Sequence, residues 1–218
     1  ARHAPMEQAL VFSDFIFHQW VRRPALLAEL LQSGALQADG DPREMRQRLA
    51  SAWQAQLGRA LPAPAGAVDP ADGLPKEAVM QVLREFRQQE MVRIALRDIC
   101  GWADLKQTMG DLSDLADSTI GAAVDYLYAR EAAAWGLPTD TKGNPVRLVV
   151  LGLGKLGAHE LNFSSDVDLI LAYAADGQTR GGSQGNTGNE AFFTRLCREL
   201  IQIIGAPTAD GFVFRVDT

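Results

Sequence analysis

The spacing of apolar and polar residues divides the chain into two parts. Up to about Trp135, apolar residues recur at helical spacing among many Leu, Ala, Arg, Glu and Gln residues, and β-branched residues are sparse. The predicted helices cover residues 6–21, 25–31, 41–57, 75–100 and 112–135. We therefore expect an α-helical region over residues 1–140.

The predicted helix over residues 75–100 carries both an apolar stripe and many charges. The stripe consists of Val79, Leu83, Phe86, Ile94 and Ile99. On the other faces, positively and negatively charged residues alternate. They are Arg84, Arg87, Arg93 and Arg97 among Glu85, Glu90 and Asp98. Such alternation is typical of an exposed face held by salt bridges, and we expect one here. Before this helix, the Pro- and Gly-rich segment 61–73 predicts a loop or linker.

The pattern changes at Gly143-Asn144-Pro145, a turn signal that precedes strand-like sequence. Short β-branched or alternating runs predict strands over residues 146–151, 169–173 and 212–217, and a helical pattern covers residues 190–204. Residues 176–189 contain five glycines and few apolar anchors, which predicts a mobile surface loop. The order strand, short helix, strand, loop, helix, strand indicates an α+β chain. Its second unit, residues 141–218, would be a small mixed sheet with helices.

Composition narrows the class of protein. With 218 residues, 47% of them apolar, the chain can bury a core without disulfides. Cys100 and Cys197 lie in no metal-ligand or dithiol spacing, which argues against zinc and redox sites. The chain begins without Met or an apolar signal core and has no run of about 20 apolar residues, so we expect a piece of a longer cytoplasmic protein. Its net charge of −6 argues against a nucleic-acid-binding surface.

One glycine-rich motif allows two interpretations. Gly152, Gly154 and Gly157 follow a predicted strand with the spacing GxGxxG, which is formally that of a dinucleotide-binding turn. That fold needs a crossover of a dozen or more residues, usually a helix. Only residues 155–161 could be helical before the turn-forming sequence Asn-Phe-Ser-Ser-Asp. The sequence therefore argues against a dinucleotide-binding fold.

The second interpretation starts from Asp166 and Asp168, at the head of an apolar strand. Alternate residues of a strand share one face, so the two carboxylates point the same way. Such a pair becomes favourable when a divalent cation binds between the carboxylates and a polyphosphate. Upstream, Gly154 and Lys155 open a short helix whose free N–H groups suit a phosphate. Together these features predict metal-dependent phosphate chemistry.

The run from Gly152 to Ile170 resembles a known family. It reads Gly-x-Gly-Lys-Leu-Gly-x-x-Glu-Leu-Asn-x-Ser-Ser-Asp-x-Asp-Leu-Ile and is similar to glutamine synthetase adenylyltransferases, which have polymerase-β-like nucleotidyltransferase domains. Segments 86–98, 112–117 and 210–217 also fit this family, so the resemblance covers nearly the whole chain and is weakest over residues 1–75. The family carries two such domains in tandem, one that attaches AMP to a glutamine synthetase tyrosine and one that removes it. The Asn-Phe-Ser-Ser sequence and the helical lead-in resemble the first, removing domain.

The resemblance implies a site, cofactors and partners. It implies a third carboxylate, Asp217, which with Asp166 and Asp168 would be catalytic and would bind Mg²⁺ or Mn²⁺. The phosphate oxygens of ATP, ADP or inorganic phosphate would contact Gly154, Lys155, Ser164 and Ser165. The implied partners are glutamine synthetase and a nitrogen-signalling protein of the PII type, without nucleic acid or membrane. We expect His159 to be a helix-surface residue and not a catalytic base.

The implied reaction is phosphorolysis, in which inorganic phosphate attacks the AMP phosphorus and releases ADP and free tyrosine. Two alternatives stay open: ATP-dependent addition of AMP to the same tyrosine, and a non-catalytic regulatory module that binds nucleotide. In the family, the strand that ends at the position of Asp217 continues into an arginine-rich stretch, whereas this chain ends at Thr218. A chain extended past Thr218 is therefore the better form for measuring activity.

Overall fold

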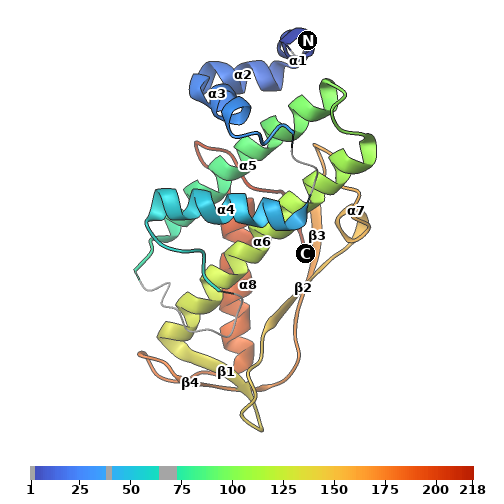
Figure 1. Ribbon diagram of the computed structural model, residues 1–218. Helices are drawn as coiled ribbons and strands as arrows, with labels where there is room; N and C mark the ends of the chain where they lie inside the picture. The colour runs from blue at the N-terminus through green and yellow to red at the C-terminus, as the bar shows by residue number, and fades with distance from the viewer. Residues whose placement is uncertain (1–2, 38–40, 64–72) are drawn as a thin grey trace.

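The computed structural model describes residues 3–37, 41–63 and 73–218 of the chain. Within these residues it contains eight helices and two small sheets (Figure 1), which confirms the expected α+β class. No strand precedes Gly136 in the described part, so the described residues up to that point form helices and their connections. Most of the loop predicted over residues 61–73 lies outside the described residues.

Three short helices lie at the amino-terminal end: α1 (His3–Phe12), α2 (Asp14–Arg22) and α3 (Pro24–Gln32). The single helix predicted over residues 6–21 is wrong, because the chain leaves the helical conformation at Ser13. The Ser13 hydroxyl accepts a hydrogen bond from the Ile16 N–H at 3.3 Å and so caps α2. Buried residues of these helices, including Ile16 and Leu26, share an apolar cluster with Leu96 near the end of α5 (Lys76–Ile99).

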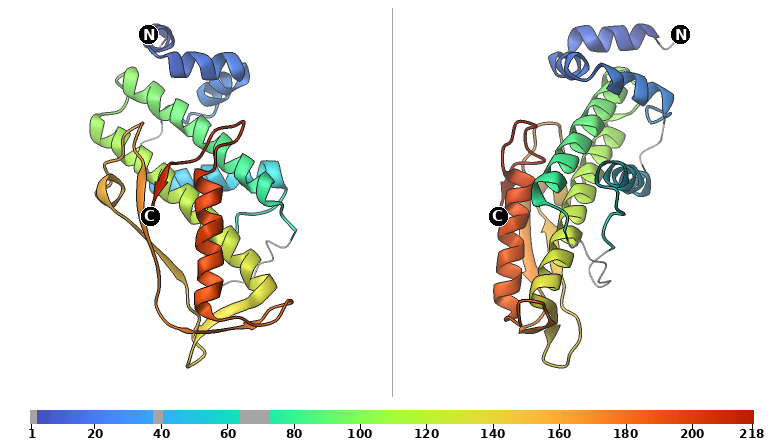
Figure 2. Two further views of the ribbon diagram at one scale, coloured as in Figure 1. Left: turned by 180° about the vertical axis from the view of Figure 1, so that it is seen from behind. Right: turned by 90° about the vertical axis from the view of Figure 1, so that its left-hand side faces the viewer.

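The longest helix, α6 (Leu105–Trp135), runs through the middle of the molecule. It lies between α4 (Pro42–Leu57) on one side and α8 (Asn189–Gly205) on the other (Figure 2). The predicted start at residue 112 is wrong, because a capping box begins the helix earlier. Asp104 accepts a hydrogen bond from the Gln107 N–H at 2.8 Å, and the Gln107 side chain accepts one from the Asp104 N–H at 2.9 Å.

The charged residues of α5 are mostly buried, so the prediction of an exposed charged face is wrong. Arg84, Arg93 and Arg97 are each at most 2% exposed, whereas Ile99, predicted to be buried, is 43% exposed. The predicted salt bridges do form, but inside the molecule. Arg93 donates to Glu90 at 2.6 Å and to Asp111 of α6 at 2.9 Å. Helix periodicity cannot reveal this burial, because other helices cover α5 on several sides.

The larger sheet has the strand order β2-β3-β5, with β2 (Leu148–Gly152), β3 (Val167–Tyr173) and β5 (Val216–Asp217). β2 and β3 are antiparallel while β3 and β5 are parallel, which gives the mixed sheet that the sequence predicts. A single helical turn, α7 (Gly154–Gly157), follows β2. Because β2 and β3 are antiparallel, the GxGxxG motif does not open a parallel dinucleotide-binding unit.

The strand predicted over residues 212–217 is reduced to its last two described positions, Val216 and Asp217. Just before it, the N–H groups of Val213 and Phe214 donate to the Ile204 carbonyl near the end of α8. Both side chains are buried, so they do not alternate between two faces as predicted. The chain is therefore fixed to α8 before it joins the sheet.

A second, two-stranded sheet lies at the far end of α6 (Figure 1) and was not predicted. It pairs β1 (Gly136–Asp140) with β4 (Gly177–Gly181) in antiparallel register. β4 falls within the segment predicted as a mobile loop, and Thr179 in its centre is fully buried. Gly177 is needed there for close contact, because a Cβ atom on it would lie 2.0 Å from the Thr139 carbonyl oxygen. The prediction of a loop without regular structure is therefore wrong.

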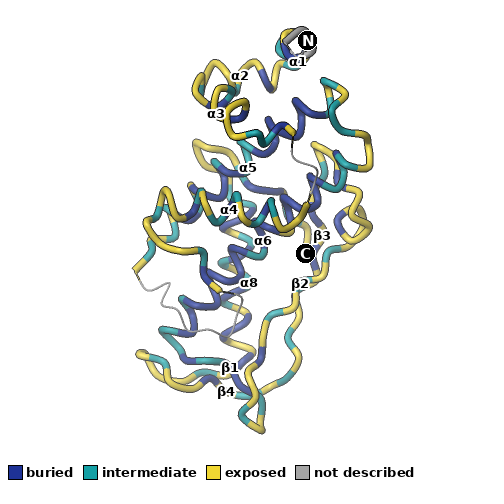
Figure 3. The backbone as a smooth tube through the Cα atoms, viewed as in Figure 1, coloured by how far each residue is buried: buried dark blue, intermediate teal, exposed yellow. Residues whose placement is uncertain are grey.

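The apolar interior consists of one large cluster and one small one. The large cluster joins α4, α5, α6 and α8 to the inner face of the mixed sheet and contains Trp53, Tyr126, Phe192 and Phe193. Figure 3 shows long buried stretches along α5, α6 and α8 and exposed stretches along the outer strands. The division of the chain into units 1–140 and 141–218 stays a prediction. None of the helices in the described part is long and apolar enough to cross a membrane.

Candidate active site

Asp168 and Asp217 lie side by side at the beginning of the mixed sheet. They are direct partners in the parallel pairing of β3 with β5, and both are exposed. Side chains at paired positions of neighbouring strands point to the same face. Val167, between Asp166 and Asp168, is fully buried on the opposite face. Two of the three predicted carboxylates therefore meet on the solvent side of the sheet.

The turn after β2 brings Gly154 against Asp168. The Leu153 N–H donates to the Asp168 carbonyl at 2.9 Å, which fixes the start of the turn beside β3. Gly154 has a φ of +53°, and a Cβ atom on it would lie 3.0 Å from Asp168 Oδ2. A larger residue would be strained by the backbone and crowded by the carboxylate. Lys155 follows and is exposed, so its ammonium group is free to face a bound anion.

A compact turn precedes Asp166 and contains the two predicted serines. The Asn162 side-chain oxygen accepts hydrogen bonds from the Ser164 N–H at 3.1 Å and from the Ser165 hydroxyl at 2.9 Å. This arrangement is an Asx turn, in which the asparagine side chain replaces a backbone acceptor. The turn holds Ser164 and Ser165 next to the start of β3. It also gives Asn162 a structural role that the sequence analysis did not assign.

Asp166 is bound by a residue that the sequence analysis did not select. The Arg215 guanidinium donates through Nε to Asp166 Oδ1 and through Nη2 to the Ser164 carbonyl, the latter at 2.9 Å. Arg215 therefore links the chain before β5 to the chain before β3. Its position two residues before Asp217, on the same predicted strand face, is the one signal in the sequence that could have found it.

The three carboxylates are not gathered into one metal-binding cluster. Among the described residues, no group of three or more His, Cys, Asp and Glu side chains is arranged to hold a metal ion. Asp168 and Asp217 are adjacent, whereas Asp166 is engaged by Arg215. The convergence of all three is therefore not found, and their assignment as metal ligands stays a prediction.

The donor set nevertheless fits a hard divalent cation. Mg²⁺ and Mn²⁺ prefer carboxylate oxygens and bind with few protein ligands when phosphate supplies others. Asp168 and Asp217 offer exposed carboxylates on one face, beside the glycine that leaves room at Asp168. Asp166 is held by Arg215 in an exposed ion pair, which solvent screens.

Two arginines of α5, the buried Arg84 and the partly buried Arg87, support the segment that leads to Asp217. Arg84 donates through Nε to the Gly211 carbonyl at 2.8 Å and through Nη2 to the Ala206 carbonyl at 2.5 Å. The Arg87 guanidinium lies 5.6 Å from the centre of the Phe212 ring and 5.9 Å from that of Phe214. Both arginines therefore hold residues 206–214, a role that the charge pattern of α5 does not predict.

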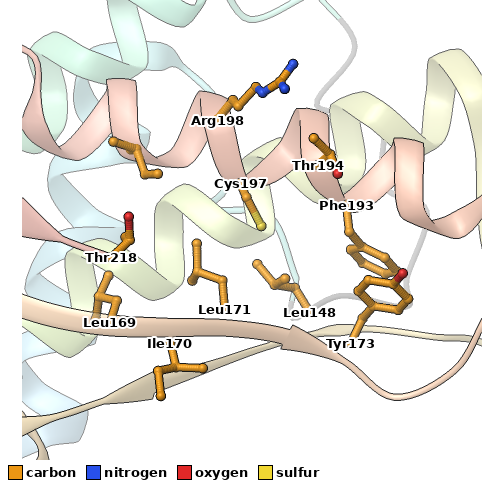
Figure 4. A pocket seen from close by; sticks show the side chains of 11 residues that line it. Leu148, Leu169, Ile170, Leu171, Tyr173, Phe193, Thr194, Cys197, Arg198 and Thr218 are labelled. Atoms are coloured by element: carbon orange, nitrogen blue, oxygen red, sulfur yellow. The ribbon is translucent and has the colours of Figure 1, made fainter.

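An apolar hollow of about 490 Å³ separates β3 from α8 (Figure 4). Leu169 and Leu171 of β3 face Cys197 of α8 across it, and Tyr173 stacks on Phe193 with ring centres 4.8 Å apart. By strand alternation, Leu169 and Leu171 point away from the face that carries Asp168. The hollow is therefore not the space in which the carboxylates would act.

His159 differs from its predicted position on the surface of a helix. α7 ends at Gly157, and His159 lies in the turn that follows, with a positive φ of 60°. Its Nε2 lies 3.3 Å from Oδ1 of Asp114, a buried residue of α6. Burial raises the pKa of Asp114 to about 6, although the nearby imidazole opposes this shift. His159 thus links the turn to α6.

Comparison with known proteins shows which family the chain resembles. The family model for glutamate-ammonia ligase adenylyltransferase matches residues 4–218. A protein of Thioalkalivibrio sulfidiphilus is 46% identical over 205 residues, and one of Pseudomonas aeruginosa is 43% identical over 206 residues. A third, from Shewanella loihica, is 39% identical over 207 residues. All three are named bifunctional glutamine synthetase adenylyltransferase/adenylyl-removing enzyme.

These matches cover 94% of this chain but only 19% of each relative, so the chain spans about a fifth of their length. The family match, by contrast, extends over nearly the whole chain, including the carboxylates, the glycine turn and the helices before them. The chain belongs to the glutamate-ammonia ligase adenylyltransferase family.

Proposed function

We propose that this chain removes AMP from the adenylyl-tyrosine of glutamine synthetase by metal-dependent phosphorolysis, with ADP as a product. The observation that carries the proposal is the pairing of Asp168 with Asp217 beside the Gly154 turn. Further support comes from the names of the relatives, which include both adenylyl transfer and adenylyl removal.

The reaction is a displacement at phosphorus. An oxygen of inorganic phosphate forms a bond to the AMP phosphorus, the bond to the tyrosine oxygen breaks, and that oxygen takes up a proton. The products are ADP and the free tyrosine side chain. Such a reaction depends chiefly on positioning the two phosphates and neutralising their charge.

The chain supplies groups for both tasks. Asp166, Asp168 and Asp217 would hold Mg²⁺ or Mn²⁺, which when bound neutralises charge on the phosphoryl oxygens. Gly154 keeps the space next to Asp168 free of side-chain atoms. Lys155 would attract the incoming phosphate. The hydroxyls of Ser164 and Ser165, which here donate to the Asn162 side-chain oxygen, would turn to donate to the phosphate oxygens.

The test is incubation of adenylylated glutamine synthetase with phosphate and Mg²⁺, with ADP and the mass of the tyrosine peptide as readouts. Both this chain and a form extended past Thr218 should be measured. ADP should appear only when phosphate is present. Formation of adenylyl-tyrosine and pyrophosphate from ATP and unmodified glutamine synthetase, without phosphorolysis, would instead establish the opposite direction. Nucleotide binding without either reaction would indicate a regulatory module.

Asp168→Asn is the variant that tests the site. It should reduce turnover by orders of magnitude, because the carboxylate beside Gly154 is lost. The exposed position of Asp168 implies that the circular dichroism spectrum and unfolding midpoint should change little. Glu160→Gln removes one negative charge from the same connection between β2 and β3 and serves as the control. Turnover of Asp168→Asn at the unmodified rate would reject the proposed site.

A further inference from the structure

The turn after α7 is attached to α6 at two neighbouring points. His159 Nε2 lies 3.3 Å from Asp114 Oδ1, and the Asp114 side chain is only 7% exposed. Two residues further on, the Leu161 N–H donates to the Ser113 hydroxyl oxygen at 3.2 Å. Ser113 gives its own proton to the Met109 carbonyl at 2.8 Å, which leaves its oxygen available to Leu161.

The conformation of His159 is unusual. It is the one residue other than glycine with a positive φ among the residues that the structure describes. L residues avoid this conformation, so it persists only where surrounding contacts maintain it. The ring lies over the surface of α6, and a Cβ atom on Gly110 would be 3.9 Å from His159 Nε2. A larger residue than glycine at position 110 would therefore contact the imidazole.

The same turn is connected to the candidate phosphate site. The Glu160 N–H donates to the Lys155 carbonyl at 2.8 Å, and the His159 N–H donates to the Leu156 carbonyl at 2.9 Å. These two hydrogen bonds join His159 and Glu160 to α7 at its carboxyl-terminal end. The other end of α7 begins at Gly154, next to Asp168.

We propose that His159 is a positioning residue: its contact with Asp114 fastens the end of the α7 turn to α6 and so holds Gly154 and Lys155 in place beside Asp168. The importance of this contact for catalysis rests on the function proposed above. The contact itself does not, because it can be measured without any reaction.

Charge makes the contact dependent on pH. The pKa of Asp114 is raised to about 6, first by burial and then by the neighbouring carboxylates, while His159 opposes the shift. The groups that act on Asp114 are His159 from the turn, Asp111 and Asp117 from α6 and Asp41 at the start of α4. The hollow beside the pair is also lined by Asp104, Lys106 and Glu160. Asp114 carries a negative charge above about pH 6 and loses it as it takes up a proton below that pH, so the charge that faces His159 depends on pH.

The first test is amide hydrogen exchange of the 218-residue chain near pH 7.5, in His159→Asn and Asp114→Asn variants. Asn tolerates a positive φ, so His159→Asn preserves the backbone preference while removing the imidazole. Exchange of the amides of residues 159–161 should become about fivefold faster in each variant, the effect expected for loss of one polar side-chain contact. Glu160→Gln, which changes one charge in the same turn, should leave these rates unchanged.

Asp114→Asn separates positioning from general stability. It removes a carboxylate whose ionisation is opposed by burial, so the midpoint of thermal unfolding should stay the same or rise. Local exchange at residues 159–161 should nevertheless increase. Combining His159→Asn with Asp114→Asn should loosen the turn no more than either change alone, because both break the same contact.

Activity is then measured in the extended chain, with phosphate as the varied substrate. Both variants should raise the KM for phosphate about fivefold and change kcat less, since the loss of the contact between His159 and Asp114 affects the placement of Lys155. Unchanged exchange at residues 159–161 in both variants would overturn the inference, as would a loss of activity that follows global unfolding. If the turn loosens as expected but no form of the protein produces ADP, the contact stands and the proposed function fails.

Discussion

Single residues determine the geometry around Asp168, and Gly154 is the most constrained of them. With its positive φ and a distance of 3.0 Å between an added Cβ atom and Asp168 Oδ2, a side chain here would strain the backbone and push the carboxylate aside. We predict that Gly154→Ala reduces turnover at least about tenfold, since the carboxylate must move, and costs about 1 kcal/mol of stability. Steady-state kinetics and denaturant unfolding measure the two effects.

Gly101→Ala is the matched control for this prediction. Gly101 has a similar φ of +67°, but a Cβ atom there would have no neighbour within 4 Å. The Gly101→Ala variant should therefore lose about as much stability as Gly154→Ala but keep the turnover of the unmodified protein. If the two variants lost activity equally, backbone strain alone would explain the result and crowding of Asp168 would not.

The raised pKa of Asp114 predicts how stability depends on pH. Folded protein retains the proton on Asp114 up to about pH 6, whereas an ordinary aspartate releases it near 3.8. The stability that this proton contributes is fully present below about pH 3.8 and is lost as the pH rises through 6. The unfolding free energy of the unmodified chain should thus fall relative to Asp114→Asn by up to about 3 kcal/mol between pH 4 and 7. A pH-independent difference between the two proteins would contradict this assignment.

At this scale the sequence predicted only part of the geometry of the site. The spacing of Asp166 and Asp168 predicts that both carboxylates share one strand face, because strand periodicity is a local property. However, β3 begins at Val167, and the Asp166 side chain is held by Arg215. The contact of Arg215 with Asp166 depends on how β5 meets β3, which involves residues 49 positions apart. Local spacing carries no information about that pairing.

Among the elements, α5 holds the segment that leads to β5. Arg84 of α5 donates to the carbonyls of Met80, Ala206 and Gly211, and it is 1% exposed. We predict that Arg84→Met lowers the unfolding free energy by about 3 kcal/mol, because buried carbonyls lose their donors. Chemical denaturation of both proteins gives this difference directly.

Gln88→Ala controls for the loss of a contact to the same segment. Gln88 donates to the Asp210 carbonyl at 2.6 Å, but this hydrogen bond is exposed. Water can replace it, so its loss should cost less than about 1 kcal/mol. If the two variants lowered the unfolding free energy equally, burial would not make the hydrogen bonds of Arg84 more stabilising than the exposed one of Gln88.

Elements with strong periodicity were predicted well, and those that depend on distant partners were not. The helix over residues 190–204 was found because Phe192, Phe193 and Leu196 form an apolar stripe. β4 was missed because its sequence, Gly-Gln-Thr-Arg-Gly, has no apolar alternation. Gly177 allows close approach to β1, and the buried Thr179 hydroxyl donates to the Trp135 carbonyl. Both contacts join residues far apart in the sequence. The local sequence shows only the density of glycines, which predicts a mobile loop.

Across the whole molecule, the two apolar clusters imply two levels of stability. The helices α1–α3 pack through their own small cluster on residues near the end of α5, including Val92 and Leu96. The large cluster joins the remaining helices to the mixed sheet. We predict that α1–α3 open at a lower free energy than α5, α6 and α8, because less apolar area holds them.

Native-state hydrogen exchange at increasing denaturant concentration measures this difference. Amides of α1–α3 should exchange through a separate opening at low denaturant, while those of α6 and α8 should exchange only with global unfolding. Leu30→Ala, in the small cluster, should accelerate the first opening and leave the second unchanged. A single common opening for all helices would contradict the prediction.

The length of α6 has a mechanical consequence. Its 31 residues correspond to a rod of about 46 Å. Trp135 at one end lies against the sheet of β1 and β4, and Asp114, about 32 Å along the helix, lies against the turn at His159. A tilt of about 5° around the Trp135 end would therefore move the helix at Asp114 by about 3 Å. A small rotation at the two-stranded sheet would thereby shift the turn beside Asp168 by more than a hydrogen bond tolerates.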